Sequence, residues 1–219
     1  MKDNKNSIRY LTVCAMFTAL AFVLVLLGKV IPNVAGFLSY EPKDAVIVAA
    51  GFLYGPMSCV LISVLCSLIE MLTISTTGLY GLLMNVVSTC AFAVPAALLY
   101  KRWHTQKGAV ASLALGVVSM AAMMLAWNYV VTPFYMGVDR SVVAGMLIPV
   151  FLPFNLVKGG LNAGLTLLLY KPLVGALRKT RLVESKSEQQ SSFRLGFTLF
   201  SLAVLLSFVL LLLALLGVL

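Results

Sequence analysis

The sequence predicts an all-α fold: a bundle of helices that crosses the membrane several times. Three observations lead to this prediction. Hydrophobic residues make up 61% of the 219 residues and the mean hydropathy is +1.03, while charged residues make up only 11%, against about 25% in soluble domains. The apolar residues fall in long runs divided by short polar segments. The alternating pattern of about ten residues that marks an outer-membrane β-barrel is missing.

The apolar runs predict six helices in one compact domain and a seventh helix after it. The first run follows a basic N-terminus like that of a signal peptide, but it continues without a small-residue cleavage site, so we expect it to be retained. The second run is short and stops at a Gly-Pro pair, which predicts a hairpin with the third run and not two ideal spanning helices. The predicted helices cover residues 7–27, 45–54, 57–72, 79–100, 109–131, 151–170 and 195–219.

The last run differs from the others because it has no charge and no polar stripe. We therefore expect residues 195–219 to form an additional transmembrane helix that anchors the chain in lipid and takes no part in a site. A six-helix domain over residues 1–178 and a basic cytoplasmic linker over residues 179–194 precede it. The predicted loops of that domain include residues 29–44, 73–78 and 134–149.

The positions of the basic residues predict the topology. Twelve of the 16 lysines and arginines lie at the N-terminus, in the loop after residue 100 and after residue 170, whereas three lie in the loops on the opposite side. Because positive residues remain inside, we expect a multi-pass protein of the cell membrane with a cytoplasmic N-terminus. This distribution accounts for the net charge of +9 without nucleic-acid binding.

A polar stripe marks the predicted helix 151–170. Lys158 lies near its centre, where a lysine costs about 2.5–3.5 kcal/mol to insert, so it should face protein, water or a ligand. Asn155, Asn162 and Thr166 fall on the same helical face. Two interpretations remain open: the stripe is one wall of a small-molecule pocket, or Lys158 only bonds carbonyls or a carboxylate of another helix.

Small residues in two helices predict close packing. Ala15 and Ala19 form a small-xxx-small pair in the first helix, which would let another helix approach. Gly159, Gly160 and Gly164 lie among the polar residues of the sixth helix, where they leave room for a neighbouring helix or a flat ligand.

The motifs of common enzyme chemistries do not occur in the sequence. It contains no phosphate-binding loop, no HExxH sequence and no Gly-x-Ser-x-Gly sequence. The four cysteines fall in apolar runs without paired spacing, so we expect buried hydrophobic residues and no metal site. His104 lies in a basic loop and is predicted to be solvated. The remaining amides, hydroxyls, aromatic rings and one lysine suit a neutral, planar, hydrogen-bonding molecule, which predicts a binding protein and not an enzyme.

Five sequence features carry a family resemblance. They are the pair Ala15 and Ala19, the segment SYEPKDAVIVAAGFLYGP, Asn85 in GLLMN, and the segments WNYVVTPFY and PFNLVKGGLNAGLTLLLYKPL. Over about residues 8–178 the chain resembles the substrate-binding S components of energy-coupling factor (ECF) vitamin transporters, most closely the riboflavin type. The resemblance implies six helices, with riboflavin held near the outer face by the first external loop and helices 4–6.

The resemblance also implies partners and site residues. The partners are a transmembrane coupling protein, against which Ala15 and Ala19 would pack, and two cytosolic ATPases. By matching positions, Asn128, Asn155 and Lys158 would be the polar anchors of riboflavin, which is a transported ligand and not a cofactor. Further candidates, chosen by their place in a loop or on a helix face, are Tyr40, Asp44 and Asn85.

Two alternatives stay open from the sequence. In the first alternative, the loop 29–44 favours another vitamin, such as thiamine, folate or pantothenate, over riboflavin. In the second alternative, the chain is an integral membrane enzyme or scaffold in which Glu70 and Lys158 form a structural ion pair.

Overall fold

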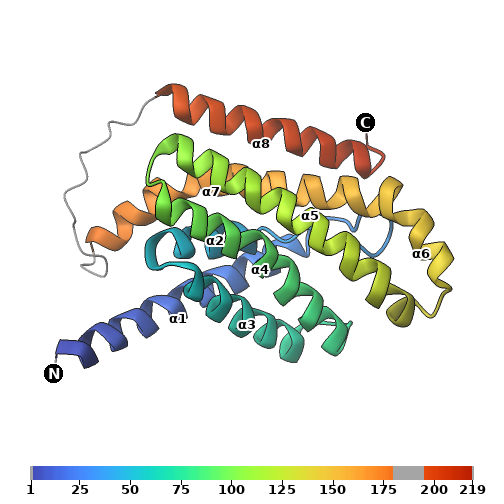
Figure 1. The fold of residues 1–219 in the computed structure, drawn as a ribbon, viewed down its shortest axis with the longest axis horizontal. Helices are drawn as coiled ribbons and strands as arrows, with labels where there is room; N and C mark the ends of the chain where they lie inside the picture. The colour runs from blue at the N-terminus through green and yellow to red at the C-terminus, as the bar shows by residue number, and fades with distance from the viewer. Residues whose placement is uncertain (1, 180–194, 219) are drawn as a thin grey trace.

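The computed structural model describes residues 2–179 and 195–218, and all regular structure in these residues is helical (Figure 1). The all-α prediction is therefore confirmed. The helices are α1 (Lys2–Gly28), α2 (Lys43–Tyr54), α3 (Pro56–Thr73), α4 (Gly78–Arg102), α5 (Gln106–Met136), α6 (Arg140–Met146), α7 (Leu152–Lys179) and α8 (Leu195–Leu215), with a π-helical turn (Leu147–Phe151) between α6 and α7.

Six helical segments of the described chain are long and apolar enough to cross a membrane. Helix α2, with 12 residues, is too short to be one of them. Helix α6, the π-helical turn and α7 together form a single span. With α6 and α7 taken as one span, successive helices run in opposite directions along the long axis, as Figure 1 shows. The N-terminus, the α4–α5 connection and the end of α7 lie at one end, and the α1–α2 loop and the α5–α6 turn lie at the other. We name these ends the inner end and the outer end after the predicted topology.

The structure corrects the predicted loop over residues 134–149. Helix α5 continues through Pro133 to Met136, and the next residue, Gly137, has a φ of 65° that gives the left-handed cap common at helix C-termini. After two further residues the chain is helical again, first as α6 and then as the π-helical turn. The sequence placed helix ends at prolines, because a proline inside a helix removes a hydrogen bond and its ring crowds the preceding turn. Helix α5 nevertheless contains Pro133, so its tertiary contacts must offset that cost.

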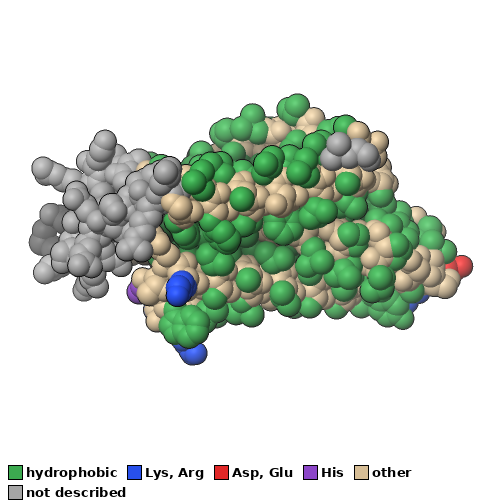
Figure 2. All heavy atoms as spheres, turned by 90° about the horizontal axis from the view of Figure 1, so that it is seen from above, with side chains coloured by type: hydrophobic (Ala, Val, Ile, Leu, Met, Phe, Trp, Pro, Cys, Tyr) green, Lys and Arg blue, Asp and Glu red, His purple; other side chains and the backbone are tan. Residues whose placement is uncertain are grey.

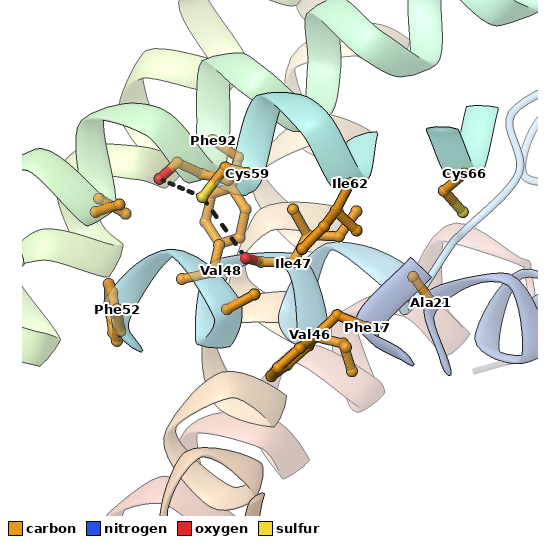
Figure 3. Close-up of a cluster of buried hydrophobic side chains, with 14 of the residues drawn as sticks. Phe17, Ala21, Val46, Ile47, Val48, Phe52, Cys59, Ile62, Cys66 and Phe92 are labelled. Carbon is orange, nitrogen blue, oxygen red and sulfur yellow. Dashed lines mark hydrogen bonds between the residues drawn. The ribbon is translucent and has the colours of Figure 1, made fainter. Parts of the chain in front are cut away.

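The short helix α2 forms the centre of the bundle. Ten of its residues are buried, and it packs against α1, α3, α4 and α7. Gly55, with φ of 91°, lets the chain turn directly from α2 into α3, where Pro56 occupies the first turn. The Cys59 thiol of α3 lies 3.6 Å from the Ile47 carbonyl oxygen and 3.8 Å from that of Ala93 (Figure 3). The hairpin predicted for the second and third runs is thus present.

The outer surface of the bundle suits lipid. Hydrophobic side chains cover most of the face in Figure 2, and the charged side chains visible there lie at the two ends. Ala15 and Ala19 are exposed on α1, so their small side chains are open to a partner. His104 is also exposed, as predicted.

Helix α8 lies along α7 (Figure 1). Its apolar window is only 11% buried, which fits the predicted additional transmembrane helix. Of the predicted linker 179–194, all but the first residue falls outside the described residues.

Candidate substrate-binding site

A cavity of about 460 Å³ opens in the outer half of the bundle, within the range of about 300–1,000 Å³ typical of small-molecule sites. Its walls come from the loop between α1 and α2 and from α3, α4, α5 and α7. Four of the residues that the sequence singled out line it: Asn85, Asn128, Asn155 and Lys158.

Two amides on the cavity wall offer a hydrogen-bond donor and an acceptor. Asn128 of α5 accepts a hydrogen bond from the Thr132 hydroxyl at 2.9 Å through Oδ1, while its buried Nδ2 has no hydrogen-bond partner among the described residues. Asn155 of α7 donates from Nδ2 to the Phe151 carbonyl at 2.7 Å, which leaves its Oδ1 to accept. An amide or imide edge of a ligand could satisfy both groups.

Lys158 satisfies both interpretations that the sequence left open. It is 7% exposed and lines the cavity, and its ammonium nitrogen lies 3.7 Å from Oε2 of Glu41. Glu41 lies in the loop before α2 and also lines the cavity. The lysine therefore has a counter-charge and still faces the space that a ligand would fill.

Behind this contact, the charged groups form a buried chain. The Lys43 ammonium lies 2.9 Å from Oε2 of Glu41 and donates to Oε2 of Glu70 at 3.0 Å. Glu70 also accepts a hydrogen bond from Asn85 at 2.9 Å and faces Lys29 at 3.7 Å. These contacts tie the loop and α2 to α3 and α4. The alternative that pairs Glu70 with Lys158 is wrong, because each has a different partner.

The Glu41 carboxyl titrates far from its ordinary range. Burial by itself raises its pKa, but the adjacent Lys43 and Lys158 ammonium groups outweigh burial and lower the pKa to about 2. Glu41 is therefore ionised at physiological pH and remains a counter-charge for both lysines.

Tyr40 and Asp44 are buried but do not line the cavity. The Asp44 carboxylate accepts a hydrogen bond from the Thr89 hydroxyl at 2.6 Å, which joins α2 to α4. Within the part of the chain that the structure describes, the Tyr40 hydroxyl has no hydrogen-bond partner, and burial raises the pKa of this phenol. Both residues stand behind the wall that the other four candidates form.

The polar stripe of α7 divides into two functions. Its outer members, Asn155 and Lys158, line the cavity. Asn162 instead accepts from the Ala45 backbone N–H at 3.2 Å and donates to the Glu41 carbonyl at 3.1 Å. It thereby caps the first turn of α2, whose own N-cap residue supplies no side-chain bond. Thr166 donates to the Ala45 carbonyl at 3.3 Å and to the Asn162 carbonyl at 2.7 Å.

Aromatic rings complete the cavity wall. Trp127 lines the cavity, whereas Tyr129 is exposed and lies under the Arg140 guanidinium at 5.9 Å. Phe37 of the loop meets Phe151 edge to face with ring centroids 5.9 Å apart, and both rings line the cavity. The loop and the start of α7 are thus joined by an aromatic contact at the cavity.

Sequence reasoning missed Glu41. A signal existed, because a buried lysine requires a counter-charge, and only three of the seven acidic residues lie within or beside the apolar runs of the outer half: Glu41, Asp44 and Glu70. The sequence narrows the partner to these three but cannot select one, since the choice depends on how the loop folds over α7.

The described residues contain no group of three or more His, Cys, Asp or Glu side chains that could hold a metal ion. Their four cysteines are free; Cys14, Cys59 and Cys66 are buried, as the sequence predicted, whereas Cys90 is only partly buried. The site is therefore one of amides, charges and aromatic rings.

Comparisons with known proteins agree with this architecture. The chain is 29% identical over 166 residues to the riboflavin transporter FmnP of Bacillus subtilis (strain 168), covering 69% of this chain and 85% of that protein. It is 26% identical over 185 residues to the riboflavin transporter RibU of Staphylococcus aureus (strain TCH60), covering 82% of this chain and 95% of that protein.

A solved structure, described as the S component of a bacterial ECF transporter, superposes with a TM-score of 0.66 at 26% identity. The match covers 80% of this chain and 99% of that one. Residues 9–170 match the family described as ECF transporter, substrate-specific component. The chain therefore belongs to the family of substrate-specific components of ECF transporters, and it is a transporter component and not an enzyme.

Proposed function

We propose that this chain binds riboflavin in the outer cavity and acts as the riboflavin-specific component of an ECF transporter. The observation that carries the proposal is the cavity of about 460 Å³ with an unpaired amide donor on Asn128, an open acceptor on Asn155 and the ammonium of Lys158 on its wall. The two relatives named as riboflavin transporters support the choice of vitamin.

The chemistry of riboflavin fits these groups. The imide edge of its ring system carries carbonyl acceptors and an N–H donor, which match Asn128 Nδ2 and Asn155 Oδ1. Lys158 would donate to a ring carbonyl or a ribityl oxygen, and Asn85 stands on another part of the wall. Trp127 offers a flat apolar surface to the ring system. Tyr40 and Asp44 would support the wall from behind.

Uptake requires partners, which we propose to be a transmembrane coupling protein and two cytosolic ATPases. In this arrangement the N-terminus lies in the cytoplasm and the cavity opens at the outer face. The exposed Ala15 and Ala19 on α1 would form the contact with the coupling protein, since small residues let helices approach closely. Exchange of either alanine for tryptophan should abolish transport by the assembled complex and leave riboflavin binding unchanged.

Riboflavin binding can be tested on the purified full chain in detergent. Flavin fluorescence should be quenched at a stoichiometry of one, and mass spectrometry should identify riboflavin in protein purified from cells that contain it. The Lys101→Met variant, which changes an exposed lysine at the inner end, serves as a control and should bind normally. Tight binding of thiamine, folate or pantothenate without riboflavin binding would assign the cavity to that vitamin and overturn the proposal.

A further inference from the structure

Helix α8 was expected to be a lipid-embedded anchor that takes no part in a site, but one of its faces is partly buried and packs on α7. A Cβ atom added to Gly160 would collide with the Phe208 ring, and one added to Gly164 would lie 3.2 Å from the Leu205 backbone. Two glycines four residues apart thus form a groove on α7 that α8 fills. The sequence allowed either a helix or a flat ligand beside these glycines, and the structure assigns the helix.

The outer half of α8 belongs to the same apolar cluster as the cavity wall. In this cluster Leu212 is buried, and Phe208 packs against the buried members. Phe151 and Phe154 are members and also line the cavity. The cluster continues into the loop between α1 and α2 through three further buried residues: Val34, Leu38 and Tyr40. No residue of α8 within the described chain lines the cavity.

We propose that α8 is a positioning element of the binding site. Phe208 and Leu212 stabilise the cluster that holds the outer part of α7 and the loop against each other, so that the cavity is already formed before the ligand arrives. Preformed sites bind more tightly because less conformational freedom is lost on binding. Lipid chains would cover the same apolar surface without fixing its shape. The identity of the ligand in this proposal rests on the proposed function.

The test compares two faces of the same helix in the full chain. Phe208→Ala and Leu212→Ala remove side chains that pack in the cluster. Leu206→Ala and Leu210→Ala remove side chains of similar size that are 60% and 48% exposed, and they serve as matched controls. Phe208→Leu is a conservative variant that retains most of the apolar contact.

Riboflavin dissociation is the first measurement. Substitutions that act without touching the ligand commonly change binding about 2- to 30-fold. We expect Phe208→Ala and Leu212→Ala to dissociate faster within that range, Phe208→Leu to recover most of the loss, and the two controls to match the wild type. Equal dissociation from the wild-type chain and from all four alanine variants would overturn the proposal.

Hydrogen exchange of the ligand-free protein is the second measurement and does not depend on which vitamin binds. Backbone amides of residues 34–40 should exchange faster in Phe208→Ala and Leu212→Ala than in the wild type and the controls. Unchanged exchange would show that α8 does not hold the loop. If exchange rises but wild-type protein binds no riboflavin, the positioning role stands and the proposed ligand fails.

Discussion

The outer and inner halves of one polar stripe on α7 have different functions: the outer half lines the cavity, and the inner half holds α2. Asn155 and Lys158 face a cavity, while Asn162 and Thr166, one to two turns further along, bind the backbone at the start of α2. The residue types are similar and the face is the same. The difference lies in the neighbour: α2 begins beside the inner pair and supplies backbone groups to it, whereas the cavity lies beside the outer pair. A polar residue within a membrane helix therefore indicates a need for a partner but not the kind of partner.

The largest loss of stability is expected from breaking the inner half. Asn162→Leu removes the hydrogen bonds of this side chain to the Ala45 N–H and the Glu41 carbonyl. The Ala45 N–H keeps the Pro42 carbonyl at 3.3 Å, whereas the Glu41 carbonyl loses this donor, and a buried group left unpaired costs about 1–3 kcal/mol. The melting temperature in detergent should fall clearly. Thr166→Val should lower the stability less, because it removes only one hydroxyl, which lies 3.3 Å from the Ala45 carbonyl and 2.7 Å from the Asn162 carbonyl. If Asn162→Leu melts like the wild type, the capping of α2 by α7 contributes little.

The largest loss of binding is expected from the outer half. Lys158→Met removes a charged donor from the cavity, and hydrogen bonds to charged groups contribute about 1.5–3 kcal/mol, or roughly 10- to 150-fold in affinity. The fold should survive, because Glu41 keeps Lys43 at 2.9 Å. Riboflavin titration and the melting temperature measure the two effects separately. If Lys158→Met lowers the melting temperature but its folded fraction binds riboflavin with wild-type affinity, Lys158 has a structural role only.

A smaller loss of affinity is expected from Asn155→Ala, which removes one neutral acceptor from the cavity. Such a bond contributes about 0.5–1.5 kcal/mol, so affinity should fall roughly 2- to 10-fold. Stability should change less than in Asn162→Leu, because the broken bond joins Asn155 to a carbonyl only four residues earlier. If Asn155→Ala and Asn162→Leu had equal melting temperatures, the two halves of the polar stripe would not differ in their contribution to stability.

The smallest effect at neutral pH is expected from the titration of Glu41. Its pKa is lowered to about 2 in the folded protein, so its contribution to stability is complete above the unfolded value of about 4.5. That contribution should disappear as the pH falls from about 4.5 towards 2. Thermal melts across this range should show a steeper decline for the wild type than for Glu41→Gln. Parallel declines would mean that other carboxyl groups dominate the acid response.

Much of the fold could be predicted from the sequence, because long apolar runs and breakers such as Gly55-Pro56 act locally. The runs predicted the helices, and the short second run predicted a hairpin. The loop over residues 134–149 was the exception, since whether a helix continues past Pro133 depends on packing that the local sequence does not contain.

The site was predictable in part. Polar side chains within membrane helices face protein, water or a ligand, and this rule together with the family resemblance predicted Asn128, Asn155 and Lys158. The structure places these three residues around one cavity. Glu41 was missed because its role depends on a loop folding over a helix more than a hundred residues away. The packing of α8 was missed for a similar reason: the sequence marks the groove at Gly160 and Gly164 but not which helix fills it.

The brevity of α2 has a consequence for how the protein is made. A 12-residue segment that begins with a lysine and an aspartate is too short to span a bilayer by itself. Asn162, which caps it, follows more than a hundred residues later in the chain. Because α7 supplies both this cap and one wall of the cavity, neither feature is complete until α7 has been synthesised.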